Sequence, residues 1–143
     1  MRTILHSTRN VSTIEYDPTV PCLIDTVTEF LYSAEFREHM NKGLELLIEK
    51  KKDHGEIGWL ANTKSIVVFQ EDDTKWIIED WHPRLVEAGI RHIAMVLPED
   101  ELVLMSNDVF DENYNTPVDK LTIKLFKDLD SAREWLMKSL KNN

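Results

Sequence analysis

The chain has 143 residues, of which 42% are hydrophobic and 30% charged, and this composition predicts one globular domain over residues 1–143 rather than a linker or low-complexity segment. Its 17 basic and 26 acidic residues give a net charge of −9, so we expect no binding to nucleic acid. The sequence has a single cysteine, which excludes an intrachain disulfide and a cysteine-based metal site. It has no apolar leader segment and no run of about 18 apolar residues, so we expect a cytoplasmic protein without membrane insertion.

The first thirty residues predict an antiparallel β meander. Three stretches rich in Thr, Val and Ile, at 3–7, 12–16 and 20–28, are separated by short polar segments. Short connections of this kind join antiparallel neighbours. Cys22 lies in the apolar stretch VPCLID, which favours a small core residue over a nucleophile.

A long helix is predicted after the meander, with Ser33 placed to cap its start and Gly55 to end it. Its apolar residues recur at helical spacing and mark one buried face: Phe36, Met40, Leu44, Leu47 and Ile48. Gly43 lies on the same face, where the missing side chain would let the helix sit close to a sheet.

The middle of the chain predicts a short strand, a polar loop and a second helix. Residues 57–60 form an apolar strand, and residues 66–69 suit either a strand or a buried loop. Asp72 or Asp73 can cap the helix that follows.

The second helix contains Pro83, whose missing N–H predicts a kink or a break near Asp80. The residues expected to face inward are Ile77, Ile78, Trp81, Leu85 and Val86.

The last third predicts two more strands and two more helices. Residues 92–97 are an apolar run typical of a central parallel strand, and a helix is expected to start at Pro98. A strand at 121–125 precedes a final helix capped by Asp128, with an apolar face made of Ala132, Trp135, Leu136 and Leu140. The fold class is therefore α/β, a mixed β-sheet with an antiparallel N-terminal meander followed by βαβ units, with helices packed on the sheet.

Two blocks, WHPRLVEAG at 81–89 and DLDSAREWL at 128–136, resemble small bacterial proteins of the SpoIIAA-like (STAS/SEC14-related) group. The resemblance spans about residues 12–140 and implies a STAS-like sheet and regulation through protein contacts. It also implies a phosphorylatable serine in the loop before the second helix, where residues 69–74 carry acid instead. Thr74 is the nearest hydroxyl, and a phosphate there would meet a helix N-terminus but also two neighbouring aspartates.

Polar residues follow the strand at 57–60, where open α/β sheets gather ligands at the carboxyl ends of parallel strands. They suit either a small polar pocket or an ordinary polar loop. The predicted partner or ligand surface comprises Asn62, Thr63, Ser65, Glu71, Asp72, Asp73, Thr74 and Trp76. Trp76 lies off the main apolar stripe and suits either an interface or packing against a neighbouring helix.

The histidines suggest two further sites, each with a structural alternative. His82 stands beside carboxylates and could serve acid–base chemistry, but helical geometry favours an exposed side chain next to a kink. Glu35 and His39 share a helical face, which favours a surface hydrogen bond because two ligands alone do not hold zinc. We expect no catalytic residue, metal or cofactor.

Together these observations predict a non-enzymatic cytosolic domain that regulates or scaffolds through an unidentified protein partner, with a homodimer as its expected state. The alternative, from the SEC14-related side of the resemblance, is a binder of a small apolar or lipid-like ligand. A hydrolase that uses His82 is the weaker alternative. An apolar cavity on the order of hundreds of Å³ would support the second of these interpretations, and a packed core would exclude it.

Overall fold

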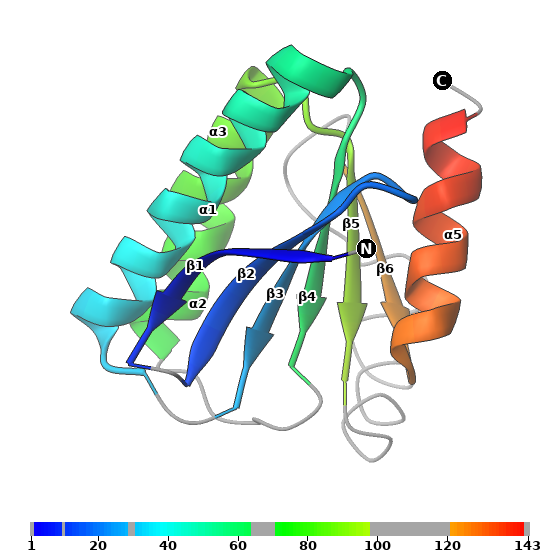
Figure 1. Ribbon diagram of the computed structural model, residues 1–143. Coiled ribbons are helices and arrows are strands. Elements are labelled where there is room, and N and C mark those ends of the chain that lie inside the picture. The colour runs from blue at the N-terminus through cyan, green and yellow to red at the C-terminus, as the bar shows by residue number, and fades with distance from the viewer. Residues whose placement is uncertain (1, 10, 29–30, 64–70, 98–120, 142–143) are drawn as a thin grey trace.

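The chain is described by a computed structural model over residues 2–9, 11–28, 31–63, 71–97 and 121–141 (Figure 1). A six-stranded mixed sheet forms its centre, with the strands side by side in chain order. The first three strands are antiparallel and the third to sixth are parallel. The strands are β1 (Thr3–Thr8), β2 (Ser12–Asp17), β3 (Cys22–Val27), β4 (Gly58–Asn62), β5 (His92–Val96) and β6 (Thr122–Phe126).

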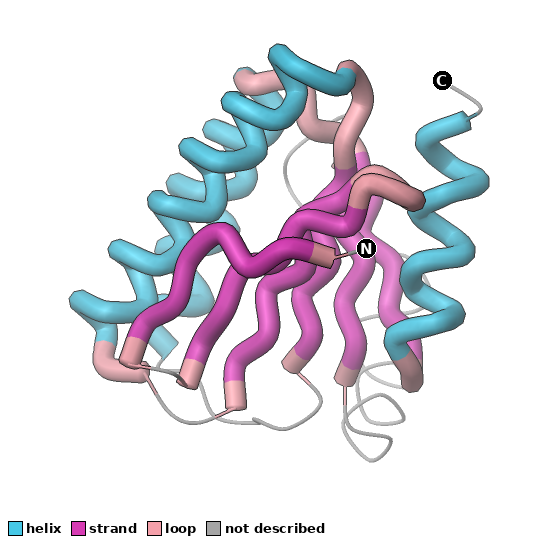
Figure 2. The backbone as a smooth tube through the Cα atoms, in the orientation of Figure 1, coloured by secondary structure: helices cyan, strands magenta, loops and turns pink. Residues whose placement is uncertain are grey.

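Helices cover both faces of the sheet and make three layers (Figure 2). One face carries α1 (Ser33–His54) and a second, composite helix made of α2 (Glu71–Trp76), η1 (Ile77–Trp81) and α3 (His82–Glu87). The other face carries α5 (Leu129–Lys141). Each interface holds its own apolar core.

The structure confirms the predicted α/β class, the antiparallel start and the position of most elements. β5 is central and parallel, and its residues contribute to both cores, as its uniformly apolar sequence predicted. Asp128 caps α5, because its Oδ1 accepts a 2.7 Å hydrogen bond from the amide of Ser131. Cys22 is fully buried, and burial raises the pKa of its thiol. The stretch at 66–69 and the helix expected at Pro98 lie outside the described residues.

Gly43 allows α1 to approach the sheet, as predicted. A Cβ at this position would lie 2.5 Å from Cη2 and 2.8 Å from Cζ3 of Trp59, closer than carbon atoms can pack. Trp59 comes from β4 and is itself only 1% exposed. The indole therefore occupies the space that any side chain at position 43 would need.

Pro83 disturbs the composite helix at the predicted place, and the disturbance is a π turn. Residues Ile77–Trp81 form η1, where the amide of His82 donates to the carbonyl of Ile77, five residues earlier. Pro83 has no amide hydrogen, so it cannot donate the hydrogen bond that would continue the α-helical pattern. The turn before it can therefore take up one extra residue. The i→i+5 turn holds one more residue than an α-helical turn, and this widens the buried face of the helix.

Candidate functional site

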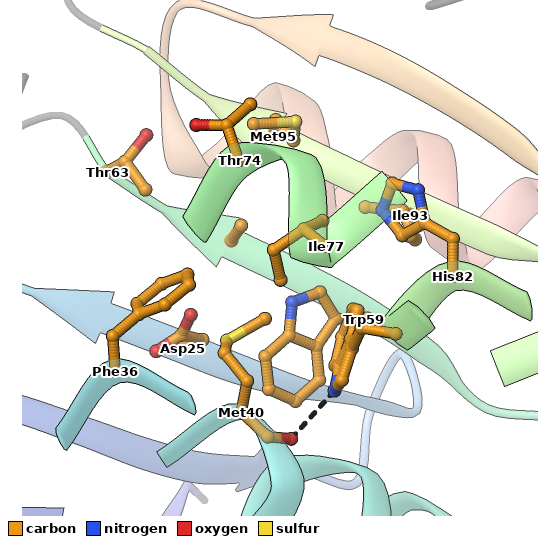
Figure 3. A pocket seen from close by; sticks show the side chains of 12 residues that line it. Asp25, Phe36, Met40, Trp59, Thr63, Thr74, Ile77, His82, Ile93 and Met95 are labelled. Atoms are coloured by element: carbon orange, nitrogen blue, oxygen red, sulfur yellow. Dashed lines mark hydrogen bonds between the residues drawn. The ribbon is translucent and has the colours of Figure 1, made fainter. Parts of the chain in front are cut away.

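A cavity of about 140 Å³ lies between the sheet and the helices α1, α2 and η1 (Figure 3). Most of its wall is apolar and is formed by Phe36, Met40, Trp59, Ala61, Ile77, Trp81, Ile93 and Met95. Four polar side chains complete the wall: Asp25, Thr63, Thr74 and His82.

The cavity extends along the sheet to the carboxyl ends of the parallel strands, starting from Trp59 and Ile93, the second residues of β4 and β5. Thr63 directly follows β4, and Met95 is the last residue but one of β5. Because β3, β4 and β5 run in the same direction, their carboxyl ends meet at one edge, and this is where open α/β sheets bind ligands. At this edge the sequence left open either a small polar pocket or an ordinary polar loop after β4. The observed cavity is mainly apolar and lies deeper, under the helices.

Two tryptophans form a fixed wall of the cavity. The rings of Trp59 and Trp81 meet edge to face, with centroids 5.1 Å apart. The indole N–H of Trp81 donates a 2.8 Å hydrogen bond to the carbonyl of Met40 in α1 (Figure 3). This bond ties η1 to α1, so the wall does not depend on apolar packing alone.

His82 is buried, and the prediction that it points into solvent is wrong. Its side chain is 6% exposed, lines the cavity, and extends from α3 toward Ile93 (Figure 3). Trp81 and His82 both lie on the inner side of the composite helix, where the wide turn η1 ends and α3 begins. Burial lowers the pKa of His82 to about 4, so the ring is neutral at pH 7. Within the described residues, its Nδ1 has no hydrogen-bond partner.

Asp25 reaches the cavity from β3 and is held by His39 of α1. Nε2 of His39 lies 2.6 Å from Oδ1 of Asp25 and 2.8 Å from Oγ of Ser12, and all three side chains are buried. The serine and the carboxylate both lie closest to the same ring nitrogen, whereas a catalytic triad uses opposite nitrogens. The cluster is therefore suited to joining β2, β3 and α1, not to nucleophilic catalysis.

The predicted surface contact between Glu35 and His39 is not formed. Glu35 pairs with Arg9, and Nη2 of the arginine lies 3.0 Å from its Oε1. The same carboxylate accepts a 3.2 Å hydrogen bond from the amide of Tyr32, at the start of α1. His39 instead lies on the helical face of Met40, which packs on the sheet and excludes water.

The residues of the predicted partner surface differ in how far the structure exposes them. Thr63 is buried, with its hydroxyl donating a 2.8 Å hydrogen bond to the carbonyl of Val96. Asn62 ends β4 and is half-buried, while Asp72 and Thr74 are exposed. The structure does not describe Ser65 or the side chain of Glu71.

The side chain of Asp73 is 2% exposed and joins α2 to α1. It accepts hydrogen bonds from the hydroxyl of Ser33 at 3.0 Å and from Nε of Arg37 at 3.1 Å, both in α1. The prediction that Asp72 or Asp73 caps the second helix is wrong, because α2 already begins at Glu71.

Trp76 is half-buried and packs against α1. Its ring meets Phe36 edge to face at 6.4 Å. The guanidinium groups of Arg37 and Arg84 lie 5.3 and 5.7 Å from the same ring, within the range of cation–π attraction. Trp76 therefore packs against a neighbouring helix, and its role in an interface stays a prediction.

Sequence reasoning missed Asp25, which is a residue of the cavity wall. The available signal was a carboxylate within the apolar strand CLIDTV, because a buried charge needs a partner and often marks a site. In the described part of the chain, no three His, Cys, Asp or Glu side chains are grouped so as to hold a metal ion. None of the described helices is long and apolar enough to cross a membrane.

Comparison with known proteins found no matching family model, no similar curated protein and no similar solved structure. The SpoIIAA-like resemblance of the sequence therefore stays a prediction, and the geometry of the cavity is the main evidence on function.

Proposed function

We propose that the protein binds a small, mainly apolar molecule in the cavity between the sheet and the helices α1, α2 and η1. The observation that carries the proposal is the cavity itself, with a wall dominated by aromatic and aliphatic side chains. Its volume of about 140 Å³ is smaller than the hundreds of Å³ expected for a lipid-like ligand. An apolar cavity of about 150 Å³ is large enough to take up benzene. The expected ligand is therefore of about that size rather than a long lipid.

The composition of both walls supports the same proposal. The sheet contributes apolar side chains such as Trp59 and Ile93, and the helices contribute others such as Met40 and Ile77. Apolar binding also corresponds to the SEC14-related side of the SpoIIAA-like resemblance, and the SpoIIAA-like fold is part of this proposal. Regulation through a protein partner stays a prediction. Of the residues named for that surface, Asp72 and Thr74 are exposed and so accessible to a partner. His82 offers little support for a hydrolase, because burial, with no charged neighbour, accounts for its lowered pKa.

Titration with toluene, followed by two-dimensional NMR, tests the proposal. We expect saturable shifts at the indole N–H resonances of Trp59 and Trp81, which line the cavity. Ala61→Leu should weaken or abolish these shifts, since Ala61 also lines the cavity and a larger side chain would fill it. Ala34→Leu makes the same exchange on the exposed side of α1 and is the matched control.

Two results would count against a ligand cavity. One is the absence of saturable shifts in the unmodified protein. The other is equal toluene binding by the Ala61→Leu and Ala34→Leu variants while both keep the native far-ultraviolet circular dichroism spectrum.

A further inference from the structure

The carboxylate of Asp25 brings an accessible oxygen without a partner to the cavity wall. His39 holds its Oδ1 at 2.6 Å, and within the described residues Oδ2 has no hydrogen-bond partner. In that part of the chain the fully buried side-chain atoms without a partner are Nδ1 of His82 and Nδ1 of His92, so Oδ2 keeps some accessible surface. Asp25 is 3% exposed and lines the cavity, where Figure 3 shows its carboxylate among the side chains of the wall. A molecule in the cavity can therefore reach Oδ2.

The rest of the wall supplies no positive charge to this oxygen. Among the described residues that line the cavity there is no lysine or arginine. Burial lowers the pKa of His82 to about 4, so its ring is neutral at pH 7. The bond from His39 needs a single N–H, which an imidazole has in its neutral form as well. A buried carboxylate is costly unless it is paired and hydrogen-bonded, so a cationic donor at Oδ2 would stabilise it.

We propose that the cavity selects a small apolar amine, bound as its ammonium ion, whose ammonium group donates a hydrogen bond to Oδ2 of Asp25. This inference rests on the proposed function, since it names the ligand class of the same cavity. The apolar part of such a ligand would lie against the rings of Trp59 and Trp81, which form the fixed wall.

The surroundings of Asp25 favour a cation over the other classes of ligand. Aromatic rings attract ammonium groups, and Phe36, Trp59 and Trp81 line the same cavity as the carboxylate. The net charge of −9 favours the approach of a cation and opposes that of an anion. A neutral hydrocarbon would fill the cavity but leave Oδ2 without a partner.

Benzylamine and ethylbenzene form a matched pair of probes, because an ammonium group in one replaces a methyl group in the other. At pH 7 benzylamine is protonated, and we expect both probes to give saturable shifts at the indole N–H resonances of Trp59 and Trp81. The preference for benzylammonium over ethylbenzene should fall by roughly tenfold to a hundredfold in Asp25→Asn. Asp53→Asn removes the same charge from the exposed end of α1 and should keep the original preference.

Two readings in the unmodified protein make the test independent of how well the Asp25→Asn variant folds. In protein labelled with ¹³C at the aspartate carboxyl carbons, saturating benzylammonium should move the resonance of Asp25 further than saturating ethylbenzene does. The benzylammonium shifts at Trp59 and Trp81 should also persist in about 1 M sodium chloride, because salt screens exposed charges far more than buried ones.

The outcomes separate the two proposals. If toluene, ethylbenzene and benzylammonium all leave the indole resonances unmoved, the proposed function itself fails. If ethylbenzene binds but benzylammonium does not, the cavity binds apolar molecules and the amine inference is overturned. The same conclusion follows if Asp25→Asn and Asp53→Asn change the preference equally, if both probes move the Asp25 resonance equally, or if salt abolishes the benzylammonium shifts.

Discussion

Gly43→Ala measures how tightly α1 is seated on the sheet. The added Cβ would lie 2.5 and 2.8 Å from two ring atoms of Trp59, and 3.4 Å from Cδ1 of Ile14. Trp59 has little freedom to retreat, because it is 1% exposed and its ring is packed against Trp81. The expected result is overpacking, in which either the indole or the helix must shift.

Two opposing effects set the size of the change. Overpacking of a core costs about 1–3 kcal/mol, and contacts this short with a pinned ring belong at the upper end. Exchange of glycine for alanine within a helix contributes about 1 kcal/mol of stabilisation through helix propensity. We therefore expect Gly43→Ala to lower the free energy of unfolding by about 2 kcal/mol.

The sign of the effect should depend on Trp59. In the Trp59→Phe background the clashing atoms Cη2 and Cζ3 are absent, so Gly43→Ala should stabilise by up to about 1 kcal/mol. Urea denaturation of the four proteins gives both differences, provided that the m-values agree. Glu45→Ala, on the exposed side of the same helix, should stay within about 0.5 kcal/mol and serves as control. An equal effect of Gly43→Ala in both backgrounds would show that the contact with Trp59 does not limit this position.

Two further predictions concern buried histidines. The pKa of His82 is lowered from 6.5 to about 4, so its contribution to stability is complete above pH 6.5 and is lost as the pH falls toward 4, by roughly 3 kcal/mol in total. Urea denaturation between pH 4 and 7 should show a shallower decline in His82→Leu, and equal slopes would contradict a buried neutral ring. His39→Leu leaves the carboxylate of Asp25 buried without its partner and should cost about 3 kcal/mol. The double variant His39→Leu with Asp25→Leu should recover part of that loss, and failure of both the loss and the recovery would argue against a buried pair.

The fold class was predictable because its signals are local. The run at β5 is apolar on both faces and must be covered on both sides, which only a central strand achieves. Asp128 at the start of α5 and Pro83 in the composite helix act within one helical turn, so their effects were foreseen at the correct positions. The close approach of α1 to the sheet at Gly43 was also predicted, because a glycine on an apolar helical face leaves room for a neighbouring side chain.

The site was harder to predict because its contacts join distant parts of the chain. His39 meets Asp25 and Ser12 across two strands and a helix, and their spacing in the sequence carries no trace of that contact. The kink near Pro83 was expected, but whether it would turn His82 inward or outward depends on the type of turn. The extra residue of a π turn rotates the residues that follow by roughly 100° relative to a regular α-helix, so the side that His82 takes depends on the turn.

The cavity wall depends on two local features of the helices, a glycine in α1 and the π turn η1. Gly43 lets α1 sit against Trp59, so that the helix and the indole form one wall together. The π turn widens the inner face of the composite helix enough to take both Trp81 and His82. Trp81 donates its N–H to the carbonyl of Met40 in α1, whereas Nδ1 of the neighbouring His82 has no partner in the described part of the chain. The π turn therefore both secures this wall, through Trp81, and buries a neutral imidazole next to it.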